Sequence, residues 1–521
     1  MSTRPTILAS ESLIATGSPL ASVAGLEVLR HGGNAIDAAI ASAAVLAVVQ
    51  PEMCGVGGDA FLLIRSSRER SVIALNGSGR APRALSTGMP VPRSGPLSAT
   101  VPGALAAWSD ALARFGSHGL DELLRPAIAL AESGFPVSAH VARALAESRA
   151  TLGARADTAA TYLPGGRSPR FGERLALPAL ARTLRFIAEH GAEAFYRGPL
   201  AERVAAGAHA AGGALSAEDL SDHHSAWLTP AETTYRGRRI LVQPPVSQGC
   251  VTLGELTLVE DDDLAALGVG SPDLVHLLLE TARLAFLDRD RYLGDPERAS
   301  VNAGIFVDRA RARERRRTVD LRQAGPAGAR TAASAGGTSY LCVVDHDGNA
   351  VSLIQSIFGD FGAGVLAGDT GVLLNNRVGG FSDDPTSPNS LAPSKRPVHT
   401  LNNCMVLAAD GSLEHVLGTP GTDAQVQTLF QLLIARLDLG VELQEAIELP
   451  RWRREPDGSV LAESRFGPAV LDALAGRGHR IVRGGPWEPR TGGAQAIFVD
   501  GARGLLHGAA DPRREGYALG W

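Results

Sequence analysis

A stretch of small residues divides this chain into two parts of different character. Residues 325–337 read GPAGARTAASAGG and contain almost no side chain that packs in a hydrophobic core, so a linker is expected. Helical spacing of alanine and leucine dominates residues 100–300, whereas apolar runs separated by Asp-Gly turns dominate after Thr338. This order of helices, linker and strands suggests one folded unit built from two segments of a single chain.

Thr338 stands where the linker ends and a strand begins. Residues 338–352 predict a strand, a tight turn at Asp347-Gly348 and a second strand. A cut after Gly337 would give Thr338 a free α-amine beside its hydroxyl. An α-amine with a pKa of about 7.7 to 8.0 is a suitable base for such a nucleophile. Taken alone, the local sequence favours an ordinary β-branched residue that opens a strand.

Composition and residue spacing exclude several classes of function. A net charge of -5 and 45% apolar residues are typical of a soluble globular protein and give no reason to expect nucleic acid or a membrane as partner. The four cysteines form no C-x-x-C pair and the thirteen histidines form no H-E-x-x-H motif, so neither a metal nor another cofactor is indicated. The most apolar stretch, Ala35–Val49, predicts a buried helix capped by Asn34 and is too short to cross a bilayer. We therefore expect a cytoplasmic protein.

A glycine-rich stretch follows that helix. Residues 55–60 read GVGGDA and formally match the dinucleotide-binding pattern G-x-G-x-x-A. That pattern must leave a strand and open a helix, whereas this stretch leaves a helix and enters a strand. A tight turn or a pocket lined by backbone is therefore expected in place of a nucleotide site.

Short motifs occur in one fixed order along nearly the whole chain. The most diagnostic is Gly337-Thr338, followed by VVD at 343–345 and DGNAVS at 347–352. The other motifs are GGNAIDAA at 32–39, GVGG at 55–58, FGAG at 361–364, LLNN at 373–376, GTPG at 418–421 and DPR at 511–513. In this order they resemble the γ-glutamyltransferase family of N-terminal-nucleophile hydrolases.

The resemblance implies an α+β fold, a four-layer αββα sandwich, made as an inactive precursor that needs no cofactor. Autocatalytic cleavage between Gly337 and Thr338 would give a large subunit, residues 1–337, and a small catalytic subunit, residues 338–521. Thr338 Oγ would then attack the carbonyl of a small-molecule amide, and water or an amine would release the acyl group. A homodimer of such heterodimers remains open.

The resemblance also assigns residues that assist Thr338. The backbone N–H groups of Gly421 and Thr422, which follow a G-x-P turn, stand at the oxyanion hole, where each donor contributes roughly 3 to 4 kcal/mol in the transition state. Ser356 takes the position of a second hydroxyl residue, which helps the nucleophile. A plain hydrogen bond within a strand would also explain Ser356, so both roles stay open.

The chain departs from the family's pattern where the substrate binds. In γ-glutamyl enzymes an arginine in F-R-E-x-A-P holds the donor's α-carboxylate, but Ser78 stands at that position and Arg80 lies two residues further on. Two acidic residues after L-L-N-N are replaced by glycine, and a pair of serines is replaced by His399-Thr400. Each of the two lost charge-assisted contacts is worth roughly 1.5 to 3 kcal/mol.

We therefore expect the amide chemistry to be kept and the γ-glutamyl specificity to be weakened, as in the oxamate amidohydrolase-like branch of the family. The candidate binders of a small anionic amide are Arg80, Asn375, Arg377, His399 and Thr400, each of which also fits a structural role. One alternative is a γ-glutamyltransferase or glutathione hydrolase that recognises its substrate with other residues. Another is an uncleaved, non-catalytic binding protein in which Thr338 is only structural.

Overall fold

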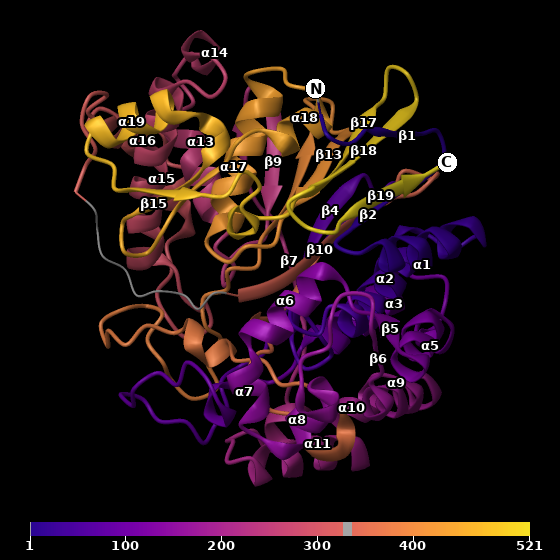
Figure 1. The fold of residues 1–521 in the computed structure, drawn as a ribbon. Coiled ribbons are helices and arrows are strands. Elements are labelled where there is room, and N and C mark those ends of the chain that lie inside the picture. The colour runs from indigo at the N-terminus through magenta and orange to yellow at the C-terminus, as the bar shows by residue number, and fades with distance from the viewer. Residues whose placement is uncertain (1, 327–335) are drawn as a thin grey trace.

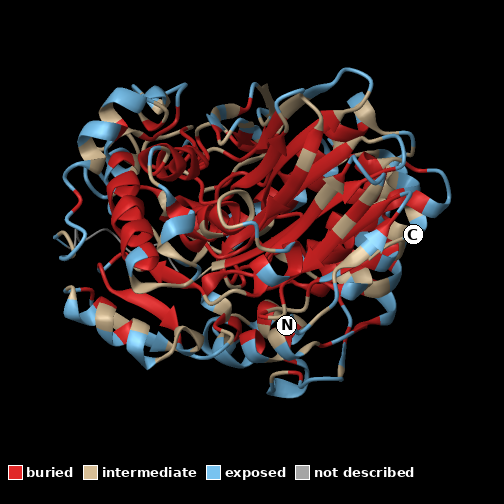
Figure 2. Ribbon diagram, turned by 90° about the horizontal axis from the view of Figure 1, so that it is seen from above, coloured by how far each residue is buried: buried red, intermediate tan, exposed pale blue. Residues whose placement is uncertain are grey.

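The computed structural model describes residues 2–326 and 336–521, so most of the predicted linker lies outside the described residues. Within them, two antiparallel sheets face each other and helices cover both outer faces (Figure 1). Buried residues concentrate in the two sheets and in the helices against them (Figure 2). The predicted α+β, four-layer αββα sandwich is confirmed.

The first sheet holds Thr338 in one of its central strands. Its order is β19 (Tyr517–Gly520), β2 (Leu13–Thr16), β10 (Gly336–Val344), β11 (Ala350–Gly359), β3 (Asp59–Ser66), β4 (Ser71–Gly77) and β7 (Ala226–Leu228). The turn at Asp347-Gly348 joins β10 to β11, as predicted. This sheet combines strands from both sides of the linker, with β2 and β3 of the first segment flanking β10 and β11 of the second, so neither segment forms it alone.

The second sheet packs against the first across an apolar layer. Its order is β1 (Ile7–Ala9), β18 (Leu505–Ala510), β17 (Gln495–Asp500), β13 (Leu413–Gly418), β12 (Asn403–Leu407), β9 (Arg238–Val242) and β8 (Ala231–Tyr235). The hairpins β12–β13 and β17–β18 confirm two predicted Asp-Gly turns. Strands β7, β8 and β9 lie within residues 100–300, which were expected to be mainly helical. β8 reads AETTY and has no apolar run, and the apolar run of β9 is limited to residues 240–242, so neither gives a clear strand signal.

Helix α2 (Ala35–Val49) packs against the central strands of the first sheet. Every residue of α2 is buried, and Asn34 accepts hydrogen bonds from the N–H groups of Ile36 and Asp37, which confirms the predicted cap. Alanine at seven of the fifteen positions of α2 lets the helix lie close to β10 and β11. Helices α1 (Pro19–Arg30) and α3 (Ala104–Phe115) cover the same face beside it.

Helices α13 (Cys250–Leu258), α15 (Pro272–Tyr292) and α17 (Ala424–Leu437) pack on the side of the other sheet. The remaining helices are α4 (Leu120–Leu123), α5 (Arg125–Ser133), α6 (Ala139–Glu147), α7 (Arg149–Gly153), α8 (Ala156–Tyr162), α9 (Pro178–His190), α10 (Glu193–Tyr196), α11 (Pro199–Ala210), α12 (Ala217–Ser221), α14 (Leu264–Leu267), α16 (Arg309–Arg316), α18 (Leu443–Glu448) and α19 (Pro468–Gly476). Two small sheets pair β5 (Phe135–Pro136) with β6 (Arg174–Leu175), and join β14 (Trp452–Arg454), β15 (Val460–Glu463) and β16 (Ile481–Gly484).

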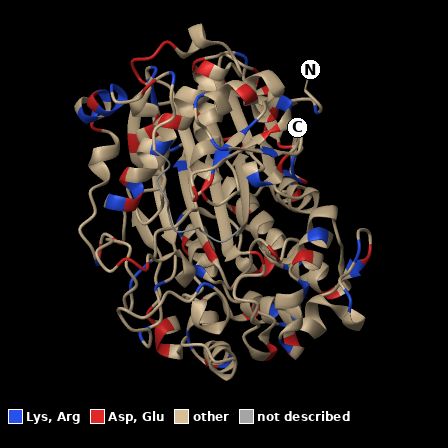
Figure 3. Cartoon of the chain, turned by 60° about the vertical axis from the view of Figure 1, so that its left-hand side comes forward, with Lys and Arg blue, Asp and Glu red and all other residues tan. Residues whose placement is uncertain are grey.

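Charges of both signs are interspersed over the molecule (Figure 3). The arginine-rich helix α16 is paired with acids of neighbouring elements: Arg311 with Asp288 and Arg316 with Asp262, each at 2.7 Å between nitrogen and oxygen. These pairs leave no basic patch on α16 that would favour a polyanion. In the part of the chain that the structure describes, every helix is too short or too polar to cross a membrane.

The glycine-rich turn at residues 55–58 connects α2 to β3, so it leaves a helix and leads into a strand, as predicted. A Cβ atom on Gly58 would lie 2.3 Å from the carbonyl oxygen of Ser356, whereas a Cβ atom on Gly55 would meet nothing closer than 4.0 Å. Gly58 is therefore required for close approach of the turn to the backbone of β11.

We predict that Gly58→Ala lowers the free energy of unfolding by roughly 1 to 3 kcal/mol, because the added methyl group displaces the backbone of Ser356. Gly55→Ala is the matched control in the same turn and stays within about 0.5 kcal/mol of the wild type. Thermal unfolding of both variants measures the difference. Equal melting temperatures for the two variants would contradict the close contact.

Candidate active site

Thr338 is buried near the start of β10, with 2% of its surface exposed. Gly337 pairs with Phe358 and Ser339 pairs with Gln355, so the strand pairing is interrupted by a bulge at Thr338. Bulges of this kind re-aim side chains beside active sites. The N–H of Thr338 lies 3.1 Å from the sulfur of Met53, at the end of the turn that follows α2.

The carbonyl group of Gly337 is held by a side chain of the neighbouring strand. The Ser356 hydroxyl donates a hydrogen bond of 2.6 Å to this oxygen, and the N–H of Phe358 donates to Ser356 Oγ at 2.8 Å. A donor at this oxygen stabilises the negative charge that forms when the carbonyl carbon is attacked. A Cβ atom on Gly337 would lie 2.4 Å from the carbonyl oxygen of Glu52, so only glycine fits before Thr338.

The turn after β13 presents two free donors beside this peptide. Gly421 and Thr422 are buried with φ angles of 131° and 53°, and within the described part of the chain neither N–H has a hydrogen-bond acceptor. Buried N–H groups are rarely left unpaired without a reason. Pro420 of the same turn and Thr338 line one cavity of about 10 Å³, enough for about one water molecule. These donors suit an oxyanion that forms next to Thr338.

Buried titratable side chains lie close to Thr338: His140 and Arg514 line the same small cavity, and His140 lies 3.8 Å from Glu52. Burial is the main cause that raises the pKa of Glu52 to about 8, lowers the pKa of His140 to about 3 and raises the pKa of Asp360 to about 6. At neutral pH the Glu52 carboxyl is therefore largely protonated, and His140 is neutral. The guanidinium of Arg514 lies 3.4 Å from the sulfur of Met53.

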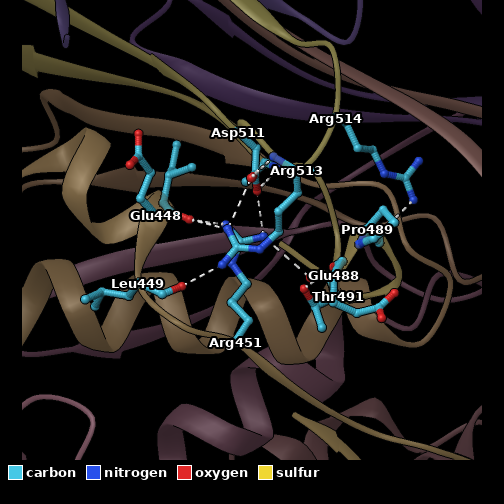
Figure 4. Close-up of polar contacts among 12 residues, drawn as sticks. Glu448, Leu449, Arg451, Glu488, Pro489, Thr491, Asp511, Arg513 and Arg514 are labelled. Atoms are coloured by element: carbon cyan, nitrogen blue, oxygen red, sulfur yellow. Dashed lines mark hydrogen bonds and ion pairs between the residues drawn. The ribbon is translucent and has the colours of Figure 1, made fainter. Parts of the chain in front are cut away.

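The segment that carries Arg514 is anchored by a second group of buried charges (Figure 4). Asp511 pairs with Arg451 at 2.7 Å and with Arg513 at 3.1 Å, and it accepts a hydrogen bond from the N–H of Ala494. Arg514 points away from this network and donates to the carbonyl oxygen of Pro489 at 3.2 Å. The DPR motif thus fixes the backbone that places Arg514 beside Thr338.

A cavity of about 450 Å³ opens next to the buried peptide. Phe358, whose N–H binds Ser356 Oγ, forms part of its wall together with the two glycines at positions 379 and 380. These glycines replace the acids expected in γ-glutamyl enzymes. The wall also includes Arg93, Gln248, Arg289, Arg291, Thr400 and Asp423.

Arg377 and His399, two predicted substrate binders, are buried close to one another, Arg377 against the ring of Phe358 and His399 against the ring of Phe61. The guanidinium of Arg377 lies 4.4 Å from the centre of the Phe358 ring and 3.4 Å from an oxygen of Asp59. Both predicted binders are fully buried, and among the described residues none of their side-chain nitrogens has a hydrogen-bond partner. Burial and the charge of Arg377 hold the pKa of His399 well below its usual value, so His399 is neutral.

The other predicted binders differ in their surroundings. Thr400 lines the cavity. Both ends of the Asn375 amide are hydrogen-bonded: its oxygen accepts from Thr100 and from the N–H of Arg377. Its nitrogen donates to the carbonyl oxygens of Gly57 and Thr100. Arg80 is not brought to the site. It pairs with Glu297 at 2.6 Å and lines a separate cavity of about 420 Å³.

Several residues of the site were not found by sequence reasoning. Phe358, Met53 and Arg514 belong to no recognisable motif. Asp423 was not predicted, although it directly follows the predicted donors Gly421 and Thr422. Their importance depends on contacts between strands and turns that are far apart in the chain. Within residues 2–326 and 336–521, no cluster of three or more His, Cys, Asp or Glu side chains is suited to a metal ion.

Two facing sheets between helical layers, with a threonine at the start of a central strand, define an N-terminal-nucleophile hydrolase. The family model described as gamma-glutamyltranspeptidase matches residues 21–521. The chain belongs to this family, and it is an enzyme that acts on amide bonds.

Three similar proteins illustrate the range of the family. The glutathione hydrolase-like YwrD proenzyme of Bacillus subtilis is 37% identical over 99% of both chains. The oxamate amidohydrolase proenzyme of Klebsiella pneumoniae is 37% identical over 96% of this chain and 97% of its own length. The crystal structure of cephalosporin acylase from Bacillus halodurans has a TM-score of 0.92 and 35% identity, covering 100% of this chain and 98% of that one.

Proposed function

We propose that the chain is an autoprocessing N-terminal-threonine amidohydrolase that cleaves a small anionic amide through an acyl-enzyme. The observation that carries the proposal is the hydrogen bond from the Ser356 hydroxyl to the carbonyl oxygen of Gly337, directly before the candidate nucleophile. Relatives at 37% identity are named as proenzymes, which agrees with a precursor that is cut into two chains.

In the first stage the precursor cuts itself. The Thr338 hydroxyl oxygen attacks the carbonyl carbon of Gly337, and Ser356 stabilises the negative charge on the carbonyl oxygen. The C–N bond breaks, the nitrogen takes up a proton and becomes the α-amine, and an ester joins Gly337 to Thr338 Oγ. A water molecule then hydrolyses the ester, and the cavity of about 10 Å³ beside Thr338 has room for it.

In the second stage the new N-terminus turns over substrate. The α-amine of Thr338 takes the hydroxyl proton as Oγ attacks the substrate carbonyl. The N–H groups of Gly421 and Thr422 bind the oxyanion, the leaving amine receives the proton, and water releases the acyl group from Thr338. The same pair of donors serves both acylation and deacylation.

The cavity wall at Phe358 favours a small anionic acyl group. Arg377 keeps its positive charge at neutral pH, because burial lowers its pKa only to about 10, and among the described residues Asp59 is the only acid that pairs with it. Phe358 lies between the guanidinium and the cavity, so Arg377 attracts an anion by its charge across the ring and makes no direct hydrogen bond to it. Positions 379 and 380 carry no acid to pair with an α-ammonium group, and of the acids in the cavity wall Asp290 and Asp423 already pair with Arg289, which disfavours a γ-glutamyl donor.

A second candidate function is γ-glutamyl transfer or glutathione hydrolysis. It is favoured by the name of the Escherichia coli relative, a glutathione hydrolase proenzyme that is 31% identical over 97% of this chain. Hydrolysis of γ-glutamyl-p-nitroanilide at a rate typical of a transpeptidase would support this candidate against the small anionic amide.

We predict that Ser356→Ala slows cleavage of the precursor by about 10²-fold or more, because the Gly337 carbonyl loses its donor. Ser356→Thr keeps the hydroxyl and cleaves. Ser352→Ala is the matched control in the same strand, since the Ser352 hydroxyl binds the Tyr340 hydroxyl at 2.7 Å, away from Gly337. Denaturing mass spectrometry over time measures cleavage, and equal rates for the two alanine variants would overturn the role of Ser356.

We also predict that Arg377→Met raises KM for an anionic amide such as oxamate by about 10-fold and leaves a neutral amide nearly unchanged, because the buried charge attracts the anion across the Phe358 ring. Arg377→Lys, which keeps the charge, recovers part of the loss. Arg80→Met, which removes a guanidinium outside the cavity, is the matched control and leaves both substrates unchanged. Steady-state kinetics on fully cleaved enzyme measures these effects. An equal loss for anionic and neutral amides would contradict recognition of the anion by Arg377.

A further inference from the structure

A side chain of the segment before the linker holds the turn that contains the free N–H groups of Gly421 and Thr422. The buried side chain of Gln248 donates a hydrogen bond of 3.3 Å to the carbonyl oxygen of Thr422 and one of 3.1 Å to the carbonyl oxygen of Thr400. Its own N–H donates to the carbonyl oxygen of His399 at 2.9 Å. Gln248, two residues before α13, therefore joins the backbones of His399, Thr400 and Thr422, of which Thr400 lines the cavity.

An arginine of α15 fixes both Gln248 and the next residue of the turn. Arg289 donates from one nitrogen to Gln248 Oε1 at 2.9 Å and to the carboxylate of Asp423 at 2.7 Å. Burial alone would lower the pKa of Arg289, but Asp290 and Asp423 outweigh burial and raise it. The guanidinium thus stays charged, and a charge-assisted bond to a buried carboxylate resists rotation of the turn.

We propose that Gln248 and Arg289 are positioning residues for the oxyanion donors. The inference rests on the assignment of the Gly421 and Thr422 N–H groups as those donors, which is part of the proposed function. The φ angle of Thr422 is 53°, in the left-handed region that costs free energy for a β-branched residue, so outside contacts must hold the turn. Among the described residues, Gln248 supplies the only side-chain hydrogen bond to the Thr422 backbone.

The arrangement separates the two stages of the chemistry. In the uncleaved chain the carbonyl oxygen of Gly337 is bound by Ser356, and neither N–H of the turn donates to it. Loss of Gln248 or Arg289 is therefore expected to leave cleavage complete while turnover slows. A role in general folding would affect both stages together.

The test uses the cleaved enzyme with variants Arg289→Gln and Gln248→Met, and with Arg283→Gln as the matched control. Arg283 lies in the same helix and pairs with Glu280 at 2.8 Å, but it is not among the residues that line the cavity. Intact mass and titration of the N-terminal threonine give the fraction of cleaved sites. Kinetics on one amide substrate then give kcat and KM per site.

We expect both variants to cleave fully and to lose kcat by about 10- to 100-fold, with KM within about 3-fold of the wild type. Arg289→Lys, which keeps a charge beside Asp423, regains part of kcat, and Arg283→Gln changes kcat little. A rise in KM at constant kcat would show that Arg289 only binds substrate, and equal effects of Arg289→Gln and Arg283→Gln would show a general structural role. Either result would overturn the proposal.

If Gln248→Met lowers the melting temperature, a loss of kcat in that variant could come from poor folding. Gln248→Glu then replaces it, because glutamate keeps an acceptor for Arg289 but has no donor for Thr422. A normal kcat in folded, cleaved Gln248→Glu would also overturn the proposal. The proposed function fails by a different result, namely activity that survives in Thr338→Ala. The two failures are thus distinguishable in the same set of proteins.

Discussion

The pairing of β10 with strands on both of its edges is the constraint on which the rest of the structure depends. β2 pairs with residues 341–344 and β11 pairs on both sides of the bulge at Thr338, so the Gly337–Thr338 peptide is fixed within the first sheet. This pairing brings the hydroxyl of Ser356 to the Gly337 carbonyl. A slip of one residue would turn Ser356 to the other face of the sheet and remove the contact.

The two segments of the chain depend on each other at every level of this arrangement. β10 and β11 belong to the segment after the linker, but their neighbours β2 and β3 and the supporting helix α2 belong to the segment before it. The turn with Gly421 and Thr422 is likewise tied to Gln248 and Arg289 of the earlier segment. A cut before Thr338 would therefore leave two chains that share one core.

Local signals in the sequence were sufficient for much of the fold. The Asn34 cap, the length of α2 and the Asp-Gly hairpins were predicted because each depends on a few neighbouring residues. Contacts between distant residues were not predictable in this way. Gln248 and Thr422 are 174 positions apart in the sequence. The position of the Arg80 side chain depends on its contact with Glu297, which is 217 positions away. Resemblance supplied the nucleophile and its donors, but it gave no account of Phe358, which covers Arg377.

The central claim is that Thr338 becomes the nucleophile by cleavage of its own precursor. The most direct measurement is the intact mass, under denaturing conditions, of the purified wild type and of Thr338→Ala. The account predicts two chains in the wild type, one ending at Gly337 and one beginning at Thr338, and a single full-length chain in the variant. A single chain in both proteins would contradict autoprocessing and favour a non-catalytic binding protein.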